Sequence, residues 1–177
     1  QIEHRSVANL IDWHRRAFAI TPSDRATQLA GVAFDAAVWE LWPYLATGAS
    51  VYIPDDETRA EPARLRDWLV AQSITIGFVP TPVAERLLAL EWPEHCALRV
   101  LLTGGDTLQR YPTAALPYAL INNYGPTENT VVTSSGRILP QAQAGVLPNI
   151  GRPIANTQVY ILDRQLQHLP GRLDAKL

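Results

Sequence analysis

The chain is poor in cysteine and has no surplus of positive charge. Cys96 is the only cysteine among 177 residues, so no internal disulfide can form. A formal net charge of -2 argues against a nucleic-acid partner, because proteins that bind nucleic acids carry clustered Lys and Arg. The histidines do not stand at the spacings of metal ligands, and we interpret them, with Cys96, as structural or solvated residues: His4, His14, His95 and His168.

Long apolar runs are missing as well. The sequence contains no run of about 18 apolar residues that could cross a membrane, and no charged and then apolar leader at its start. Hydrophobic residues make up 47% of the chain, which is enough for one good core in a globular protein. We therefore predict a cytoplasmic protein without a membrane partner.

What the chain does contain is an alternation of strand-like and helix-like stretches. Parallel strands need crossover connections, so this alternation predicts a doubly wound α/β fold, with a mostly parallel sheet flanked by helices on both faces. The expected strands are 27–33, 50–53, 74–79, 98–103 and 118–121, and the expected helices are 7–18, one that begins at Ala36 and closes near Gly48, 62–72 and 81–90.

The pattern changes after residue 121. Two further strand-like stretches, 131–135 and 157–162, have no helix between them, so we expect them to lie antiparallel at an edge or in a small neighbouring sheet. This divides the chain into an α/β subdomain at 1–140, a loop with strands leading to a next subdomain at 141–170, and a separate fragment at 171–177.

Polar residues follow three of the expected strands. These are Phe34-Asp35, Thr103-Gly104-Gly105-Asp106 and the segment 122–128, Asn-Asn-Tyr-Gly-Pro-Thr-Glu. In an open parallel sheet the carboxyl ends of the strands face one ligand-binding crevice. Each segment also has a plainer interpretation, since Asp35 and Asp106 could cap helices and Gly-Pro is a common turn signal. The sequence contains no Ser-His-Asp pattern, no G-x-S-x-G and no GxxxxGK[ST].

Four ordered motifs carry a family resemblance that spans about residues 1–170. Residues 34–40, Phe-Asp-Ala-Ala-Val-Trp-Glu, resemble the FDxSVWE motif of adenylation domains from nonribosomal peptide synthetases, with Ala37 where the family usually has Ser. Residues 102–106 are similar to the LxxGG(E/D) segment, 123–128 to NxYGPTE and 150–154 to IGRPI. The resemblance implies a flavodoxin-like subdomain of an adenylate-forming enzyme.

The resemblance also implies an ATP site. Adenylation joins an amino-acid carboxylate to the α-phosphate of ATP and expels pyrophosphate, so ATP and Mg2+ are the expected cofactors. Thr127 and Glu128 match the catalytic positions, and the Glu128 carboxylate, a hard oxygen ligand, would bind Mg2+. The nucleotide would contact Gly104, Gly105, Asp106, Asn122, Tyr124, Gly125 and Thr127.

By the same resemblance, Asp35 would bind the α-ammonium group of an amino acid through a charge-assisted hydrogen bond. The matching side-chain pocket is almost entirely apolar, which argues against a charged substrate. Its two large rings limit the volume and favour leucine, with isoleucine and valine close behind, because one methylene discriminates by only about 1–3 kcal/mol. Without the motifs the same residues would suit a plain core. They are Ala36, Trp39, Phe78, Leu102, Gly104, Asn123, Val131 and Val132.

In this family a phosphate-binding loop is expected upstream of Gln1 and a catalytic lysine in a following small domain. We therefore expect the 177-residue chain to bind better than it catalyses. The segment 171–177 is similar to the family's GRxDxQVK hinge motif, which would make Asp174 the hinge. Either residues are absent between Pro170 and Gly171, or this match is accidental.

The expected partners are the peptidyl carrier domain, whose phosphopantetheine thiol receives the aminoacyl group, and the condensation domain of the same assembly line. Two other functions stay open at this point. The chain could be an isolated or engineered subdomain that binds an amino acid without turnover. An acyl-CoA synthetase is a further alternative, although Asp35 would have no role with a fatty acid.

Overall fold

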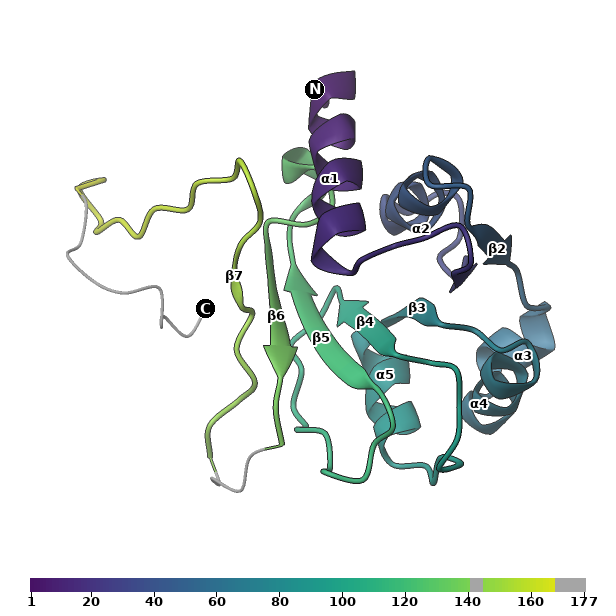
Figure 1. Ribbon diagram of the computed structural model, residues 1–177. Helices are drawn as coiled ribbons and strands as arrows, with labels where there is room; N and C mark the ends of the chain where they lie inside the picture. Colours follow the sequence, from purple (N-terminus) through teal and green to yellow (C-terminus); the bar gives the residue numbers. More distant parts are fainter. Residues whose placement is uncertain (141–144, 168–177) are drawn as a thin grey trace.

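The computed structural model describes residues 1–140 and 145–167, and these contain one seven-stranded sheet with the order β2-β1-β3-β4-β5-β6-β7 (Figure 1). Strands β1 to β5 are parallel, and β6 and β7 are antiparallel to their neighbours. The parallel order 2-1-3-4-5 is that of flavodoxin-like sheets, which confirms the predicted fold class. The strands are β1 Arg25–Thr27, β2 Ser50–Tyr52, β3 Ile76–Pro80, β4 Val100–Gly104, β5 Ala119–Tyr124, β6 Ser134–Ile138 and β7 Arg152–Pro153.

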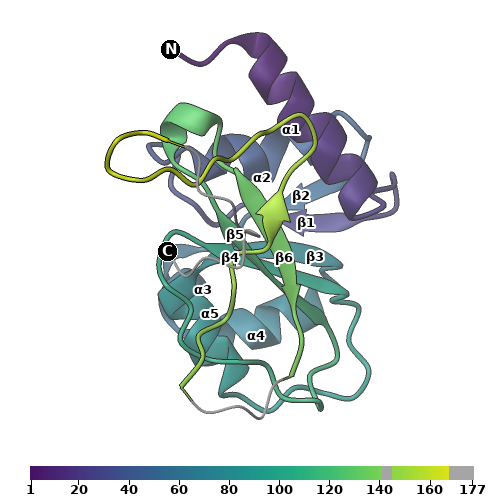
Figure 2. The same ribbon diagram turned by 90° about the vertical axis from the view of Figure 1, so that its left-hand side faces the viewer.

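Helices cover both faces of this sheet, as Figure 2 shows in a view from the β7 edge. Helices α1 (His4–Ala17) and α2 (Ala36–Leu45) lie on one face, and α4 (Pro62–Ala71) and α5 (Thr81–Leu88) on the other, with the short α3 (Asp56–Ala60) beside α4. Successive strand residues point to opposite faces. Phe78 of β3 accordingly packs in the core under α1 and α2, and the next residue, Val79, in the core under α4 and α5.

The expected first strand, 27–33, is largely wrong: β1 lies earlier in the chain, at Arg25–Thr27, and overlaps the expected range only at Thr27. It ends at Thr27, and residues 28–35 form a loop. The reason is a buried carboxylate: Glu40 of α2 accepts the backbone N–H of Leu29 at 2.9 Å and that of Ala30 at 2.7 Å. These N–H groups therefore bond a side chain instead of a neighbouring strand.

The trailing strands also differ from the expectation. Residues 131–133 precede β6, because Thr130 and Val131 have φ values of +59° and +69° and the Val132 N–H bonds the Thr130 carbonyl at 2.8 Å in a tight turn. The expected strand 157–162 is wrong: a turn in which the Thr157 N–H bonds the Ile154 carbonyl starts an irregular segment, with only an isolated bridge at Leu162. Figure 1 shows this yellow segment leaving the sheet.

No helix among the described residues is both long and apolar enough to cross a bilayer. The predicted hinge residue Asp174 lies outside the described residues, and the division into parts at 140 and 170 stays a prediction.

Candidate active site

The polar motif segments meet at the carboxyl edge of the parallel sheet. Strands β4 and β5 are direct neighbours, with Thr103 opposite Asn122 and Gly104 opposite Asn123. The glycine pair at the end of β4 and the segment that begins at Tyr124, the last residue of β5, therefore leave the sheet side by side. The loop after β1, which carries Asp35, starts from the same edge because β1 is parallel to both strands.

Asp35 is joined directly to the segment after β5. The Thr127 hydroxyl, in the 3-10 turn η1 (Thr127–Asn129), donates to Asp35 Oδ2 at 2.7 Å, although 92 positions separate the two residues. The Asp35 side chain accepts no capping hydrogen bond from α2. The alternative in which Asp35 only caps its helix is therefore wrong, and the expected ammonium-binding carboxylate lies beside the expected phosphate-binding hydroxyl.

The helix-cap alternative for Asp106 is also wrong. The segment from Asp106 to Tyr118, which lies wholly within the described residues, forms no helix, and Asp106 Oδ1 instead accepts the N–H of its neighbour Thr107 at 2.6 Å. The crossover from β4 to β5 is therefore a loop. Asp106 is left exposed next to Gly105, on the side of the sheet edge where a ligand could reach it.

The apolar members of the predicted pocket lie in one cluster. Trp39 of α2 and Phe78 of β3 have ring centroids 5.4 Å apart, and Phe78 lies opposite Leu102 across the β3–β4 ladder. Val132 is buried with them, and Ala36 and Val131 pack against the cluster while half-buried. The structure thus brings these apolar residues together in one core cluster. The same contacts would also form in a plain core, so the pocket assignment depends on Asp35 and the motifs.

The two asparagines at the end of β5 have different surroundings. Asn122 donates its amide to the Asn149 carbonyl at 3.0 Å and so ties the segment before β7 to β5. Asn123 donates to the Thr103 carbonyl at 3.0 Å, while its Oδ1 is buried and has no hydrogen-bond partner among residues 1–140 and 145–167. Buried polar atoms nearly always have a partner. Asn123 Oδ1 is therefore an acceptor to which a ligand could bond.

Tyr124, Thr127 and Glu128 form the open rim of the site, whereas Gly104 and Asn122, which were predicted to contact the nucleotide, are buried. Tyr124 is 45% exposed, and Thr127 and Glu128 are exposed in η1. Gly125 connects Tyr124 to this turn and is half-buried. The exposed Glu128 carboxylate lies next in sequence to Thr127, whose hydroxyl bonds Asp35. Such a carboxylate fits a Mg2+ ion, because Mg2+ is usually held by one or two carboxylates together with substrate phosphates.

Gly104, the last residue of β4, and Gly105, the residue after it, have different steric constraints. A Cβ on Gly104 would lie 2.6 Å from the Asn123 carbonyl oxygen, whereas a Cβ on Gly105 would meet nothing within 4 Å. Gly104 is thus required by the close approach of β5. Of these two predicted nucleotide contacts, only Gly105 has open space beside its Cα.

This difference leads to a paired prediction. Gly104→Ala is expected to lower the free energy of unfolding by about 1–3 kcal/mol, because the methyl group must push β5 away. Gly105→Ala, at φ +90°, should cost only about 1 kcal/mol, from backbone strain. Urea unfolding of both variants measures the difference, and equal losses would contradict the assigned contact between Gly104 and Asn123.

Glu40 is a residue whose role the sequence did not reveal. Its side chain is 2% exposed and accepts N–H groups of the loop that leads to Asp35. Burial raises the pKa of Glu40 to about 7, while the hydrogen bonds from Ala30 and Leu29 act in the opposite direction. Its place in the motif with Asp35 and Trp39 was the available signal. Glu40 therefore positions the loop that holds Asp35.

A raised pKa in the folded state makes stability depend on pH. The contribution of Glu40 to the free energy of unfolding is fully present below its unfolded-state pKa of 4.5. It is lost as the pH rises through its folded-state pKa of about 7. We expect the stability of the wild type relative to Glu40→Gln to fall by roughly 3 kcal/mol between these pH values. Urea unfolding from pH 4 to pH 8 measures it, and a difference that stays constant with pH would contradict the raised pKa.

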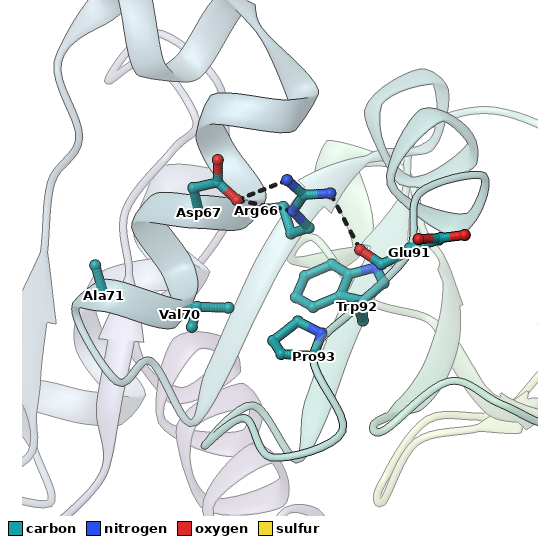
Figure 3. A pocket seen from close by; sticks show the side chains of 7 residues that line it. All are labelled: Arg66, Asp67, Val70, Ala71, Glu91, Trp92 and Pro93. Atoms are coloured by element: carbon teal, nitrogen blue, oxygen red, sulfur yellow. Dashed lines mark hydrogen bonds and ion pairs between the residues drawn. The ribbon is translucent and has the colours of Figure 1, made fainter.

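Two surface hollows lie away from these residues. One of about 550 Å3 is formed between α4 and the segment after α5, where Arg66 bridges the Asp67 carboxylate and the Glu91 carbonyl (Figure 3). A second, of about 220 Å3, lies between α1 and the β6–β7 edge. Among the predicted site residues that the structure describes, none lines either hollow.

Comparison with known families agrees with this fold and this cluster of motifs. Residues 1–173 match the family described as AMP-binding enzyme, so the chain belongs to the AMP-binding enzymes, which are adenylate-forming ligases. Within that family its resemblance to the adenylation domains of nonribosomal peptide synthetases is confirmed by the relatives and structures that follow.

The chain is 58% identical to part of a linear gramicidin synthase from Brevibacillus parabrevis over 170 residues, which are 96% of this chain and 2% of that protein. It is 46% identical to Surfactin synthase subunit 2 of Bacillus subtilis (strain 168), over 96% of this chain and 4% of that protein. The chain thus spans a small part of the curated relatives that it matches.

Solved structures are similar as well. The nonribosomal peptide synthetase FmoA3 superposes with a TM-score of 0.82 at 30% identity, over 94% of this chain and 19% of that one. A second structure, the four-domain nonribosomal peptide synthetase AB3403 bound to AMP and glycine, gives a TM-score of 0.80 at 31% identity, over 96% of this chain and 13% of that one.

Proposed function

We propose that this chain supplies the amino-acid pocket and part of the ATP site of an adenylation domain that activates leucine for nonribosomal peptide synthesis. The observation that carries the proposal is the hydrogen bond from Thr127 to Asp35. It places a carboxylate suited to an α-ammonium group beside a hydroxyl suited to a phosphate. An amino acid held at Asp35 would direct its own carboxylate toward the bound nucleotide.

In the proposed reaction a carboxylate oxygen of the amino acid attacks the α-phosphorus of ATP. The bond to the β-phosphate oxygen breaks, and aminoacyl-AMP and pyrophosphate form. In the second step a phosphopantetheine thiol on a carrier protein attacks the acyl carbon, forms a thioester and releases AMP. Mg2+ would neutralise phosphate charge when it is bound at Glu128. The condensation domain of the same assembly line would use the thioester, and the site of action would be the cytoplasm.

Three residues of the candidate site, Asp35, Thr127 and Tyr124, would have tasks that their positions support. Asp35 binds and orients the ammonium group, and the Thr127 hydroxyl can exchange its bond to Asp35 for one to the α-phosphate. The exposed Tyr124 ring offers a face for adenine. Related proteins bind such ligands: one FmoA3 structure, at 29% identity, is described as bound to α-methyl-L-serine-AMP.

The choice of leucine depends on the pocket walls. Trp39 and Phe78 are large rings packed in one cluster with Leu102, and apart from Asn123 the predicted lining is apolar or glycine. A branched aliphatic side chain is the best match to such a lining, since a charged one would be buried without a partner. An acyl-CoA synthetase is disfavoured because a fatty acid gives Asp35 no cation to bind.

The test is an ATP–pyrophosphate exchange assay with each of the twenty amino acids, on a complete adenylation domain that carries these residues and on the 177-residue chain in parallel. We expect exchange with leucine above isoleucine and valine in the domain, and weak or no exchange in the chain. A preference for acidic or aromatic amino acids would overturn the assigned pocket. Binding of leucine by the domain without any exchange would favour a subdomain that only binds.

A further inference from the structure

The indole of Trp39 is held by a side chain from another helix. Its Nε1–H donates to His14 Nδ1 of α1 at 2.9 Å, and the opposite ring nitrogen, Nε2, lies 3.1 Å from the Tyr44 hydroxyl of α2. Trp39, His14 and Tyr44 are 2%, 0% and 2% exposed, so water does not compete for these bonds. The three side chains form one buried polar network inside an apolar core.

The network permits a single protonation state of His14. Because Nδ1 accepts the hydrogen bond from the indole N–H, the proton of the neutral His14 ring must sit on Nε2. Nε2 then donates to the Tyr44 oxygen. Burial, with a smaller effect of the Arg99 charge, lowers the pKa of His14 to about 3. His14 is therefore a neutral ring of fixed tautomer at physiological pH, and it is a geometric support for Trp39 rather than a proton carrier.

The contacts continue from this support to the predicted pocket. The His14 ring is nearly perpendicular to the Trp39 ring, with ring centroids 5.7 Å apart and an interplanar angle of 89°. It is also nearly perpendicular to the Tyr44 ring, with a centroid distance of 5.2 Å and an interplanar angle of 85°. Trp39 in turn lies 5.4 Å from Phe78. If the acceptor at His14 were lost, the buried indole N–H would be unsatisfied and the ring would turn to find another partner.

We propose that His14 is a specificity-determining residue that acts through Trp39: it fixes the plane of the indole, and with it the size of the amino-acid pocket, without touching the substrate. The proposal rests on the proposed function, because it requires Trp39 to be a wall of that pocket. It assigns Tyr44 the role of holding the His14 tautomer in which Nδ1 is free to accept.

The test measures discrimination rather than activity alone. In a complete adenylation domain carrying these residues, kcat/KM for exchange is measured with the amino acid that the wild type prefers and with phenylalanine. His14→Leu removes the acceptor, and we expect the ratio of the two values to fall by about tenfold or more as the freed indole admits larger side chains. The KM for ATP should stay within about twofold, since His14 lies outside the nucleotide rim.

Two variants serve as controls on the same helix. His14→Asn places an amide oxygen near the position of Nδ1, so it should restore the ratio to within about threefold of the wild type. His4→Leu changes an exposed histidine at the start of α1 and should leave the ratio unchanged. A folded His14→Leu with the wild-type ratio would overturn the proposal, as would a His14→Asn that is no better than His14→Leu.

If His14→Leu does not fold, the proposed tautomer of His14 can still be tested on the wild type alone. In 15N spectra of histidine-labelled domain, His14 is expected to show Nε2 protonated and Nδ1 unprotonated between pH 6 and pH 8. A protonated Nδ1 would overturn the proposal. The two proposals fail separately: a wild-type domain without amino-acid-dependent exchange contradicts the proposed function, whereas normal exchange with an unchanged ratio contradicts only the role of His14.

Discussion

Asp35→Ala is expected to lower leucine-dependent exchange by roughly two to three orders of magnitude in a complete adenylation domain carrying these residues. The carboxylate is half-buried and is already engaged by the Thr127 hydroxyl. An ammonium group that binds there has no other carboxylate of this loop to pair with. Losing one partner of such a charge pair costs about 2–5 kcal/mol, and the loss should appear in kcat/KM for the amino acid.

Asp35→Asn separates charge from hydrogen bonding. The amide oxygen can still accept from Thr127, so any loss in this variant comes from the missing negative charge. Asp67→Asn is the matched control, since Asp67 is an exposed aspartate on α4 paired with Arg66. Exchange at the wild-type rate in both Asp35 variants would mean that Asp35 serves only as the acceptor for Thr127, and the amino-acid site would have to lie elsewhere.

The alternation of strands and helices was sufficient to predict the parallel sheet, because a parallel sheet leaves few ways to connect its strands. It was not sufficient to predict where β1 ends. The run 27–33 is apolar enough for a strand, yet the Glu40 carboxylate binds the N–H groups of Leu29 and Ala30. This competition between a side chain and a neighbouring strand depends on tertiary contacts, which helix propensity and hydrophobic periodicity do not predict.

The candidate site was predictable for a different reason. Each motif segment follows a parallel strand, so sheet geometry alone places the segments at one edge. What the motifs could not show is contact, such as the bond between Thr127 and Asp35. The histidines illustrate the same limit: His14 was interpreted as structural or solvated, and its burial against Trp39 shows that it is structural. The partner that gives His14 a role lies 25 positions away.

The segment between Gly125 and β6 has some features that the sequence predicted and others that only the structure shows. The turn residues Gly125 and Pro126 were expected, but the positive φ values of Thr130 and Val131 were not. A β-branched residue with positive φ is strained, and such strain persists only where surrounding contacts enforce it. Here the Thr133 N–H bonds the Tyr124 carbonyl at 2.7 Å and closes the loop. The closed loop presents Thr127 and Glu128 together at the rim.

Glu128→Gln is expected to lower exchange by about a hundredfold or more and to raise the Mg2+ concentration needed for half-maximal rate. The amide keeps the size of the side chain but removes the negative charge that a hard cation prefers. Because Glu128 is exposed and η1 is short, the change should leave the fold intact. The loss would therefore come from the metal-bound nucleotide, and the KM for the amino acid should change far less than kcat.

A Mg2+ titration at saturating ATP and leucine makes this distinction. Glu94→Gln, an exposed glutamate in the segment after α5, is the matched control and should keep the wild-type titration curve. Partial recovery of the Glu128→Gln rate at high Mg2+ is expected, since substrate phosphates provide the remaining ligands. A variant with the wild-type rate and the wild-type Mg2+ dependence would remove Glu128 from the metal site, while Asp35 and Thr127 could still hold the amino acid against the nucleotide.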